Sequence, residues 1–362
     1  MPPTTPPLST PPAQRKKWPL ALSVLIMLGL AGGAGYYVIH QQTAPQLVGE
    51  SSGQGEPTPS TPVALGEFSD NRLVVIEGYS GNAEEPFLTP DGEYLLFDDR
   101  SNGTNIPKIY YAKRVNDATF TFMGEVQGVN NASSPSIMAI MDDHNNFYFN
   151  SPRPPDPKSA IYRGLWHSNG TVTDVAPVPG LAAKAEQGAK LISSISRDGQ
   201  TLYFGYGDLQ GKDYIGIALQ NPDGTFTELT DASSDTRMLK WKDEFKNIYG
   251  MYYGGKSGTR FSGPFMTTPD GLEAYFEQIN SVVSGWPPQL NQLYVAKRTS
   301  TSEPFGPPQV VAGQATLANG KPGFNEGAFV SRDGNLLYYH HLDLVEGQDP
   351  HNARFSIYVM SR

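Results

Sequence analysis

The chain has 362 residues, of which 38% are hydrophobic and only 17% charged, with 38 glycines and 31 prolines. Such a composition is typical of a protein built from many short strands and turns. The absence of cysteine excludes disulfides, zinc–thiolate sites and a cysteine nucleophile. The formal net charge of −9 argues against nucleic acid as a partner, because contacts to phosphate require a positive surface.

The first predicted element is a transmembrane signal anchor at residues 18–40. It contains a long run of uncharged residues, enough for one helix to cross about 30 Å of hydrocarbon. Basic residues stand at 15–17, and none follows before Arg72, so the positive-inside rule predicts that residues 1–17 are a cytoplasmic tail. A cleaved signal peptide is the competing interpretation, in which the rest of the chain is secreted.

Residues 41–66 are rich in Gln, Gly, Ser, Pro and Thr, and we expect them to form a flexible linker because they cannot bury enough apolar surface to fold. Residues 67–362 then form one domain in the periplasm or outside the cell. All 36 acidic residues of the chain lie after the apolar segment. An acidic exported domain favours a protein or glycan of the cell envelope as its partner.

Within this domain a short phrase occurs five times: Asp, usually followed by Gly, and then an apolar stretch that ends in Phe or Tyr. The turn aspartates are Asp91, Asp143, Asp198, Asp270 and Asp333. Asp-Gly provides the positive φ angles of a tight turn, and the residues after it favour a strand. Further strands follow each hairpin, so the five copies predict an all-β domain, a five-bladed β-propeller.

The fifth copy ends at Arg362, directly after its third strand. Residues 68–79 have the pattern of a fourth strand, but no first three strands of a blade precede them. We therefore expect this N-terminal strand to complete the last blade and close the ring, which leaves no free sheet edge there.

An insertion at residues 231–254, between the third and fourth copies, carries apolar residues at helical spacing. We expect a helix on the face away from the Asp-Gly turns. It either packs over the edge of a blade or forms a lid or a partner-binding helix.

The repeated phrase resembles that of TolB-like, WD-type propellers, in which a Ser/Thr-Pro-Asp-Gly turn precedes a hydrophobic strand. Residues 89–92 and 268–271 match it fully, whereas residues 196–199 and 331–334 lack only the proline. In the second copy, His144 is expected in the glycine position. The resemblance covers residues 68–362 and implies a propeller. TolB-like proteins have six blades and a preceding α/β domain, neither of which this sequence predicts, so no specific partner follows from the resemblance.

Strand direction places the start of each first strand and the end of each second strand on the face opposite the Asp-Gly turns. Charged residues and histidines gather at these positions, so we expect ligands to bind there. The candidate binding residues are Glu85, Asp98, Asp99, Arg100, Arg153, Asp208, Arg260, Glu277, Glu326, His340, His341 and Asp343. Equivalent positions of Glu85 and Glu326 predict either an inter-blade hydrogen bond or a binding role. His340 and His341 should point to opposite sides of their strand.

Two functions agree with this pattern. The first is a membrane-anchored module that binds a protein or glycan of the cell envelope. The second is a glycan-cleaving enzyme that uses a pair of carboxylates in the central funnel. The sequence contains no HExxH, Walker or dinucleotide motif, and we predict no catalytic residue, metal ligand or cofactor. Because no glycosidase motif accompanies the carboxylates, the sequence favours binding.

Overall fold

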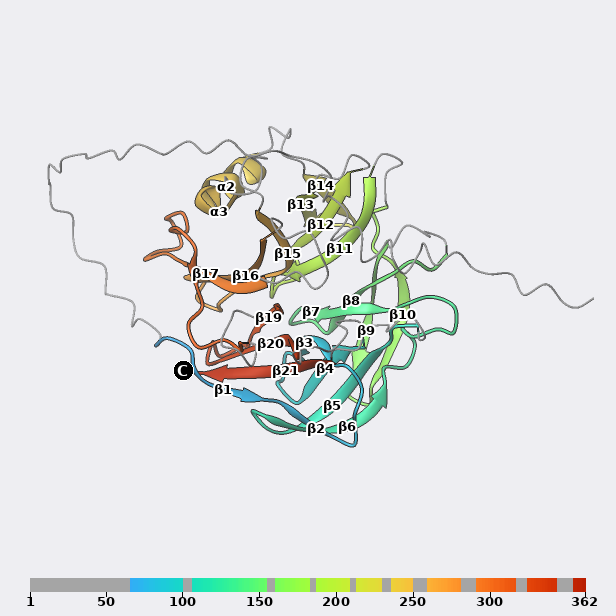
Figure 1. Cartoon of the computed structure of the whole chain (residues 1–362). Coiled ribbons are helices and arrows are strands. Elements are labelled where there is room, and N and C mark those ends of the chain that lie inside the picture. The colour runs from blue at the N-terminus through green and yellow to red at the C-terminus, as the bar shows by residue number, and fades with distance from the viewer. Residues whose placement is uncertain are drawn as a thin grey trace, which may run out of the picture.

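The computed structural model describes residues 66–99, 106–154, 160–182, 187–208, 213–229, 236–249, 259–280, 291–316, 324–343 and 354–362. The predicted tail, anchor and almost all of the linker lie outside these residues. None of the helices in the described part has the length and hydropathy needed to cross a bilayer. The described strands form five sheets around a common centre (Figure 1), as expected for a five-bladed propeller.

Each sheet is one blade, with its first strand nearest the centre of the ring. Blade 1 contains β3 (Glu84–Leu88), β4 (Tyr94–Asp98), β5 (Ile109–Asn116) and β6 (Thr119–Glu125). Blade 2 contains β7 (Ile137–Met141), β8 (Asn146–Ser151), β9 (Ala160–His167) and β10 (Thr171–Pro177). Blade 3 contains β11 (Gln187–Ile195), β12 (Thr201–Asp208), β13 (Asp213–Gln220) and β14 (Phe226–Leu229). Blade 4 contains β15 (Thr259–Thr267), β16 (Glu273–Asn280), β17 (Asn291–Lys297) and β18 (Gln309–Val310). Blade 5 contains β19 (Asn325–Val330), β20 (Leu336–Asp343) and β21 (Arg354–Ser361).

The N-terminal segment closes the ring. Its first part, β1 (Ser69–Leu73), pairs antiparallel with β21 and becomes the fourth strand of blade 5, which confirms the expectation. Its second part, β2 (Val75–Glu77), pairs in parallel with β6 as a fifth strand of blade 1. The same short segment therefore holds the last blade to the first.

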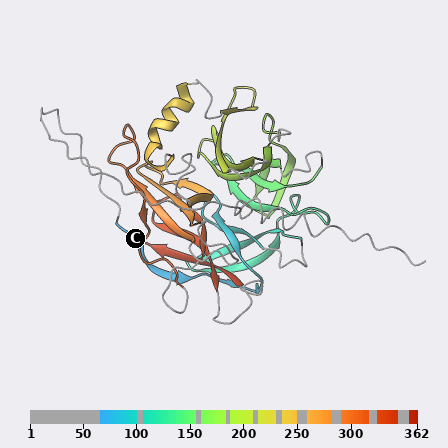
Figure 2. The same cartoon turned by 45° about the horizontal axis from the view of Figure 1, so that its top comes forward.

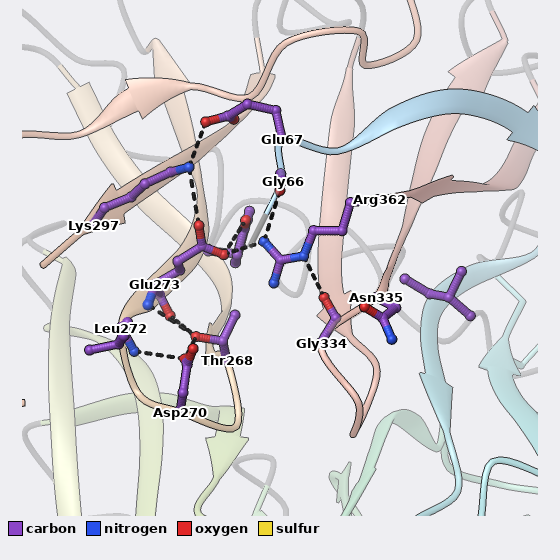
Figure 3. A network of polar contacts seen from close by, with 12 residues as sticks. Gly66, Glu67, Thr268, Asp270, Leu272, Glu273, Lys297, Gly334, Asn335 and Arg362 are labelled. Atoms are coloured by element: carbon purple, nitrogen blue, oxygen red, sulfur yellow. Dashed lines mark hydrogen bonds and ion pairs between the residues drawn. The ribbon is translucent and has the colours of Figure 1, made fainter. Parts of the chain in front are cut away.

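A network of charges fixes this segment to blade 4 as well (Figure 3). The carboxylate of Glu273, buried at the start of β16, pairs with both Lys297 and Arg362. Lys297 also binds Glu67, with its Nζ atom 2.7 Å from Oε1. The guanidinium of Arg362 stacks over the ring of Phe68 at 4.4 Å. Residues from both ends of the described propeller thus meet on blade 4.

The second turn differs from the expectation. Asn145, rather than His144, takes the left-handed position that glycine fills in the other turns, with φ of 63°. Asp142 replaces the Ser or Thr of the repeat and accepts hydrogen bonds from the backbone N–H groups of His144 and Asn146. Asn tolerates this conformation better than most residues, which explains how the turn forms without glycine.

The insertion forms the expected helix, as α2 (Thr236–Glu244) and α3 (Lys246–Tyr249). The helices lie beside blades 3 and 4 (Figure 2). Their buried apolar residues Trp241, Phe245 and Ile248 pack against residues of both blades. Glu244, at the end of α2, pairs with Arg298 at 2.8 Å. Arg298 in turn donates to the carbonyl of Gly271 in the fourth turn. The helix therefore reaches the Asp-Gly end of blade 4, and the expected position on the opposite face is wrong.

Ring closure predicts a strong effect of Phe68→Ala. This change removes an edge-to-face contact with Tyr275 at 5.5 Å and the stacking partner of Arg362. We expect the free energy of unfolding, measured by urea denaturation, to fall by about 3 kcal/mol. Leu73→Ala, at a half-exposed position nearby, is the matched control and should change it by less than about 0.5 kcal/mol. Equal effects of the two changes would contradict the role assigned to the closing segment.

Candidate functional site

The strand register fixes which positions correspond between blades. Glu84 lies opposite Asp98 in blade 1, and Glu326 lies opposite His340 in blade 5. Glu84 therefore corresponds to Glu326, and Glu85 corresponds to Gly327. The expected equivalence of Glu85 and Glu326 is wrong by one residue.

The same inter-blade hydrogen bond occurs at four of the five junctions of the ring. In each, a backbone N–H of a first strand donates to a side chain near the end of the second strand in the preceding blade. The distances are 2.8 Å from Met138 to Asp98, 2.7 Å from Ile192 to Asn150, 2.8 Å from Gly327 to Glu277 and 3.1 Å from Glu85 to His340. The acceptors include three of the residues expected to bind a ligand.

A left-handed backbone turns three of these N–H groups toward the neighbouring blade. The φ angles are 49° at Glu85, 59° at Met138 and 68° at Gly327, each at a shift in strand register. Such a bulge takes the N–H group out of the sheet's own ladder, so another acceptor must satisfy it. At Gly327 a Cβ atom would lie only 2.8 Å from Nδ1 of His340, which excludes larger residues.

The junction between blades 3 and 4 lacks the acceptor of this bond. Gly205 stands where the other blades carry the acceptor, and glycine has no side chain to accept it. This is the junction over which α2 and α3 pack, so apolar burial holds the two blades together where the hydrogen bond is missing.

Burial divides the candidate residues into three groups. The side chains buried in the ring belong to Asp98, Glu277, Glu326, His340 and His341. The residues of intermediate exposure are Glu85, Asp99, Arg153 and Asp343. Arg100 lies outside the described residues, and for Asp208 and Arg260 only the backbone, in β12 and β15, is described.

Two of the partly exposed residues are engaged in local contacts. Arg153 donates to Ser151 at 2.9 Å and stacks over the ring of Tyr162 at 5.2 Å. Asp99 accepts a hydrogen bond of 2.6 Å from the backbone of Lys108. These contacts position the ends of the second strands in blades 1 and 2.

The two histidines point to opposite sides of β20, as expected. Nδ1 of His340 accepts from Glu85 in blade 1, whereas Nδ1 of His341 lies 2.8 Å from Oδ1 of Asn325 in blade 5. Burial lowers the pKa of His341, and Asp343 opposes this shift. Since Nε2 of His341 is 3.9 Å from Asp343, the two do not form a close ion pair at neutral pH.

Glu85, Glu326 and His340 are the one set of described residues whose ligand atoms converge as a metal site requires, within 4.8 Å. Because Nδ1 of His340 accepts a backbone N–H, the neutral ring carries its proton on Nε2, which faces Glu326 at 3.5 Å. A metal-ligating histidine normally donates from its second nitrogen, so this tautomer does not suit a metal. The geometry instead suits a hydrogen-bonded link between blades 5 and 1.

Asp98, which lies near Glu84 and Glu85, is a buried carboxyl group with a clearly shifted pKa. Burial raises its pKa well above the ordinary value, and the nearby charges of Glu85 and Glu84 act in the same direction. The hydrogen bond from Met138 opposes this shift without cancelling it. The folded protein therefore stabilises the protonated form of Asp98 relative to an aspartate exposed to water.

The centre of the ring holds a cavity of about 20 Å³, enough for a single water molecule. Glu85 is the charged residue at its wall. The remaining lining residues are apolar or uncharged and include Phe87, Met138, Ile192, Met266 and Phe329. This cavity is too small and too apolar to hold a sugar between two carboxylates.

Solved structures similar to this chain include both TolB proteins and glycoside hydrolases. A protein provisionally named TolB from Agrobacterium tumefaciens is 17% identical, with a TM-score of 0.36, over 74% of this chain and 72% of that one. TolB from Acinetobacter baumannii is 15% identical, with a TM-score of 0.34, over 64% of this chain, which spans 47% of that protein. A family 117 glycoside hydrolase from Zobellia galactanivorans is 10% identical, with a TM-score of 0.45, over 81% and 90% of the two chains.

No protein-family model matches the sequence, and neither does any curated protein. At these identities and TM-scores the structural matches do not distinguish a binding protein from an enzyme. The site must therefore be judged from its own geometry.

The raised pKa of Asp98 predicts that Asp98→Asn stabilises the protein at neutral and alkaline pH. An acid with a raised folded-state pKa contributes its full stability below the ordinary pKa and loses it as the pH rises through the raised value. Asn cannot ionise but can accept from Met138, in the same way that Asn150 of blade 2 accepts from Ile192 of blade 3. We expect the free energy of unfolding at pH 8 to rise by about 1–3 kcal/mol, with little change at pH 4.

The control is Asp174→Asn, at an exposed edge position, which should be neutral at both pH values. Chemical denaturation across this pH range makes the comparison. A lower stability of Asp98→Asn at pH 8 would contradict the prediction and would mean that the ionised carboxylate is required.

Proposed function

We propose that this chain is a membrane-anchored binding module of the cell envelope, whose exported propeller captures a protein or glycan. The observation that carries the proposal is the use of three candidate side chains, those of Asp98, Glu277 and His340, as links between blades. Groups committed to a backbone N–H in the ring interior are poor candidates for acid–base chemistry on a substrate. The partner would then bind to the surface around these groups.

The half-exposed candidates define the binding surface. Glu85, Asp99 and Asp343 lie at the face opposite the Asp-Gly turns, and the side chain of Asp343 is 39% exposed. Their negative charge agrees with a partner that presents cationic or hydrogen-bond-donating groups. The proposed TolB-like, WD-type repeat agrees with a role in binding but specifies no partner.

The point where the chain enters the propeller supports this orientation. Arg362 donates to the carbonyl of Gly66 at 3.4 Å and to that of the turn residue Gly334 at 2.7 Å. Gly66, the first described residue, therefore lies at the Asp-Gly end of the propeller. The face opposite the Asp-Gly turns, which carries Glu85, Asp99 and Asp343, is called the acidic face. With the anchor proposed at residues 18–40, this acidic face is the one farther from the point where the chain enters the propeller.

A glycan-cleaving enzyme is the alternative. Hydrolysis requires two carboxyl groups about 5–10 Å apart beside an opening that admits a sugar. Glu277 and Asp98 are buried and bonded to the neighbouring blades, and the central cavity holds about one water. The geometry favours binding over this chemistry.

Site-specific photo-cross-linking of the full-length chain in its native envelope tests the proposal. With the cross-linker at Asp99 or Asp343, we expect capture of the same envelope protein or glycan. Thr121 on β6 and Thr173 on the outermost strand β10 are exposed; they are the matched control positions and should capture much less. Equal capture from all four positions, or glycan cleavage by the purified chain, would contradict it.

A further inference from the structure

The second position of the Ser/Thr-Pro-Asp-Gly turn is proline in two of the five turns, as Pro90 and Pro269. The other three turns have a charged residue there. The three residues are Asp143 in blade 2, Arg197 in blade 3 and Arg332 in blade 5. The structure brings them together at the Asp-Gly end. Nε of Arg197 lies 3.1 Å from Oδ2 of Asp143, and Nη2 of Arg332 lies 2.7 Å from Oδ1.

This arrangement crosses the ring, because blades 2 and 5 are not neighbours. Arg332 extends to blade 2, where it also donates to the carbonyl of Met141 at 3.3 Å. The backbone supports the other side, since the N–H of Asp143 donates to the carbonyl of Arg197 at 2.8 Å. The two guanidinium groups are thus held on either side of one carboxylate.

One carboxylate does not use all the donors of two arginines. Nε of Arg332 is buried and has no hydrogen-bond partner among the described residues. Burial lowers the pKa of Arg332, and the like charge of Arg197 adds to this effect while Asp143 opposes it. The adjacent carboxylate of Asp142 accepts from the backbone of its own turn instead. An external carboxylate that replaced Asp143 would therefore find donors that are already in place.

Water reaches part of this cluster. The side chains of Arg197 and Asp143 are 47% and 40% exposed, whereas that of Arg332 is 20% exposed. The exposed pair with Arg197 contributes only about 0–1 kcal/mol, so an external group can replace the carboxylate of Asp143 there at small cost. Arg332, held deeper, stays in position for the incoming group.

We infer that Arg197 and Arg332 form a carboxylate-binding site that Asp143 occupies as an internal ligand. Its external ligand is an acidic side chain or terminal carboxylate of a protein partner. A carboxylate is favoured over a phosphate because the internal occupant already sets the spacing of the two guanidinium groups for a carboxylate. This site lies at the opposite end of the ring from the proposed binding face, and it depends neither on that face nor on the membrane anchor.

Asp143 and an external carboxylate compete for the same two arginines. This competition predicts a change in affinity that a purely structural ion pair would not show. Removing the internal ligand should increase the affinity for an external carboxylate, because the competent state becomes more populated. Removing either arginine should abolish binding. A structural cluster would instead lose stability in all three variants and bind nothing in any of them.

Titration calorimetry of the full-length chain with a tetraglutamate peptide at low salt tests this inference. We expect Asp143→Asn to bind about tenfold more tightly than the unmodified chain, and Arg197→Gln and Arg332→Gln in the same background to lose this binding. Arg114→Gln is the matched control, since Arg114 forms a comparable ion pair with Asp117 elsewhere. No gain in Asp143→Asn, or tighter binding of inorganic phosphate than of tetraglutamate, would overturn the assignment.

A second measurement needs no variant. Phenylglyoxal modifies accessible arginines, and tetraglutamate should slow its reaction with Arg197 in the unmodified chain by about threefold, whereas tetraglutamine should not. Mass spectrometry locates the modification. Equal protection by both peptides would overturn the inference even if Asp143→Asn failed to fold.

Discussion

The ring depends on one hydrogen bond, from a bulged residue of a first strand to a side chain of the preceding blade. A buried N–H group without an acceptor costs about 1–3 kcal/mol, so each bulge demands a partner in the neighbouring sheet. The requirement concerns position rather than chemical type, because Asp98, Asn150, Glu277 and His340 all meet it. Polar residues therefore gather at one end of the propeller for a structural reason.

The five junctions do not all use this bond. Gly205 removes the acceptor at the junction between blades 3 and 4. Trp241 and its neighbours in α2 and α3 fill the same junction with apolar contacts. At the junction between blades 5 and 1, the hydrogen bond from Glu85 to His340 is supplemented by β1 and β2, which pair with both sheets. Hydrogen bonds, apolar contacts and strand pairing therefore each hold different junctions of the ring together.

The architecture could be predicted from the sequence because Asp-Gly turns and strand patterns are local. The fold of each hairpin and the closing role of residues 68–79 follow from such signals. The pairing of β2 with β6 could not be predicted, since a three-residue parallel strand has no pattern of its own. The roles of Glu277 and His340 also escaped, because their partners lie on other blades, far away in the sequence. The sequence did contain a signal for the cluster at the Asp-Gly end, because Arg197 and Arg332 replace the proline of the repeat in their turns.

The two ends of the propeller use charge in different ways, and this difference bears on function. At the acidic end, buried carboxylates accept backbone N–H groups, and exchanging such a bond would leave a donor unpaired in the interior. At the Asp-Gly end, the contact between Asp143 and Arg197 joins half-exposed side chains, and water can replace either partner, whereas Arg332 is held deeper. Contacts that a partner can exchange therefore lie at the Asp-Gly end and along the rim of the acidic face. The interior acceptors keep the five blades in register, so that these two surfaces keep their shape whatever binds to them.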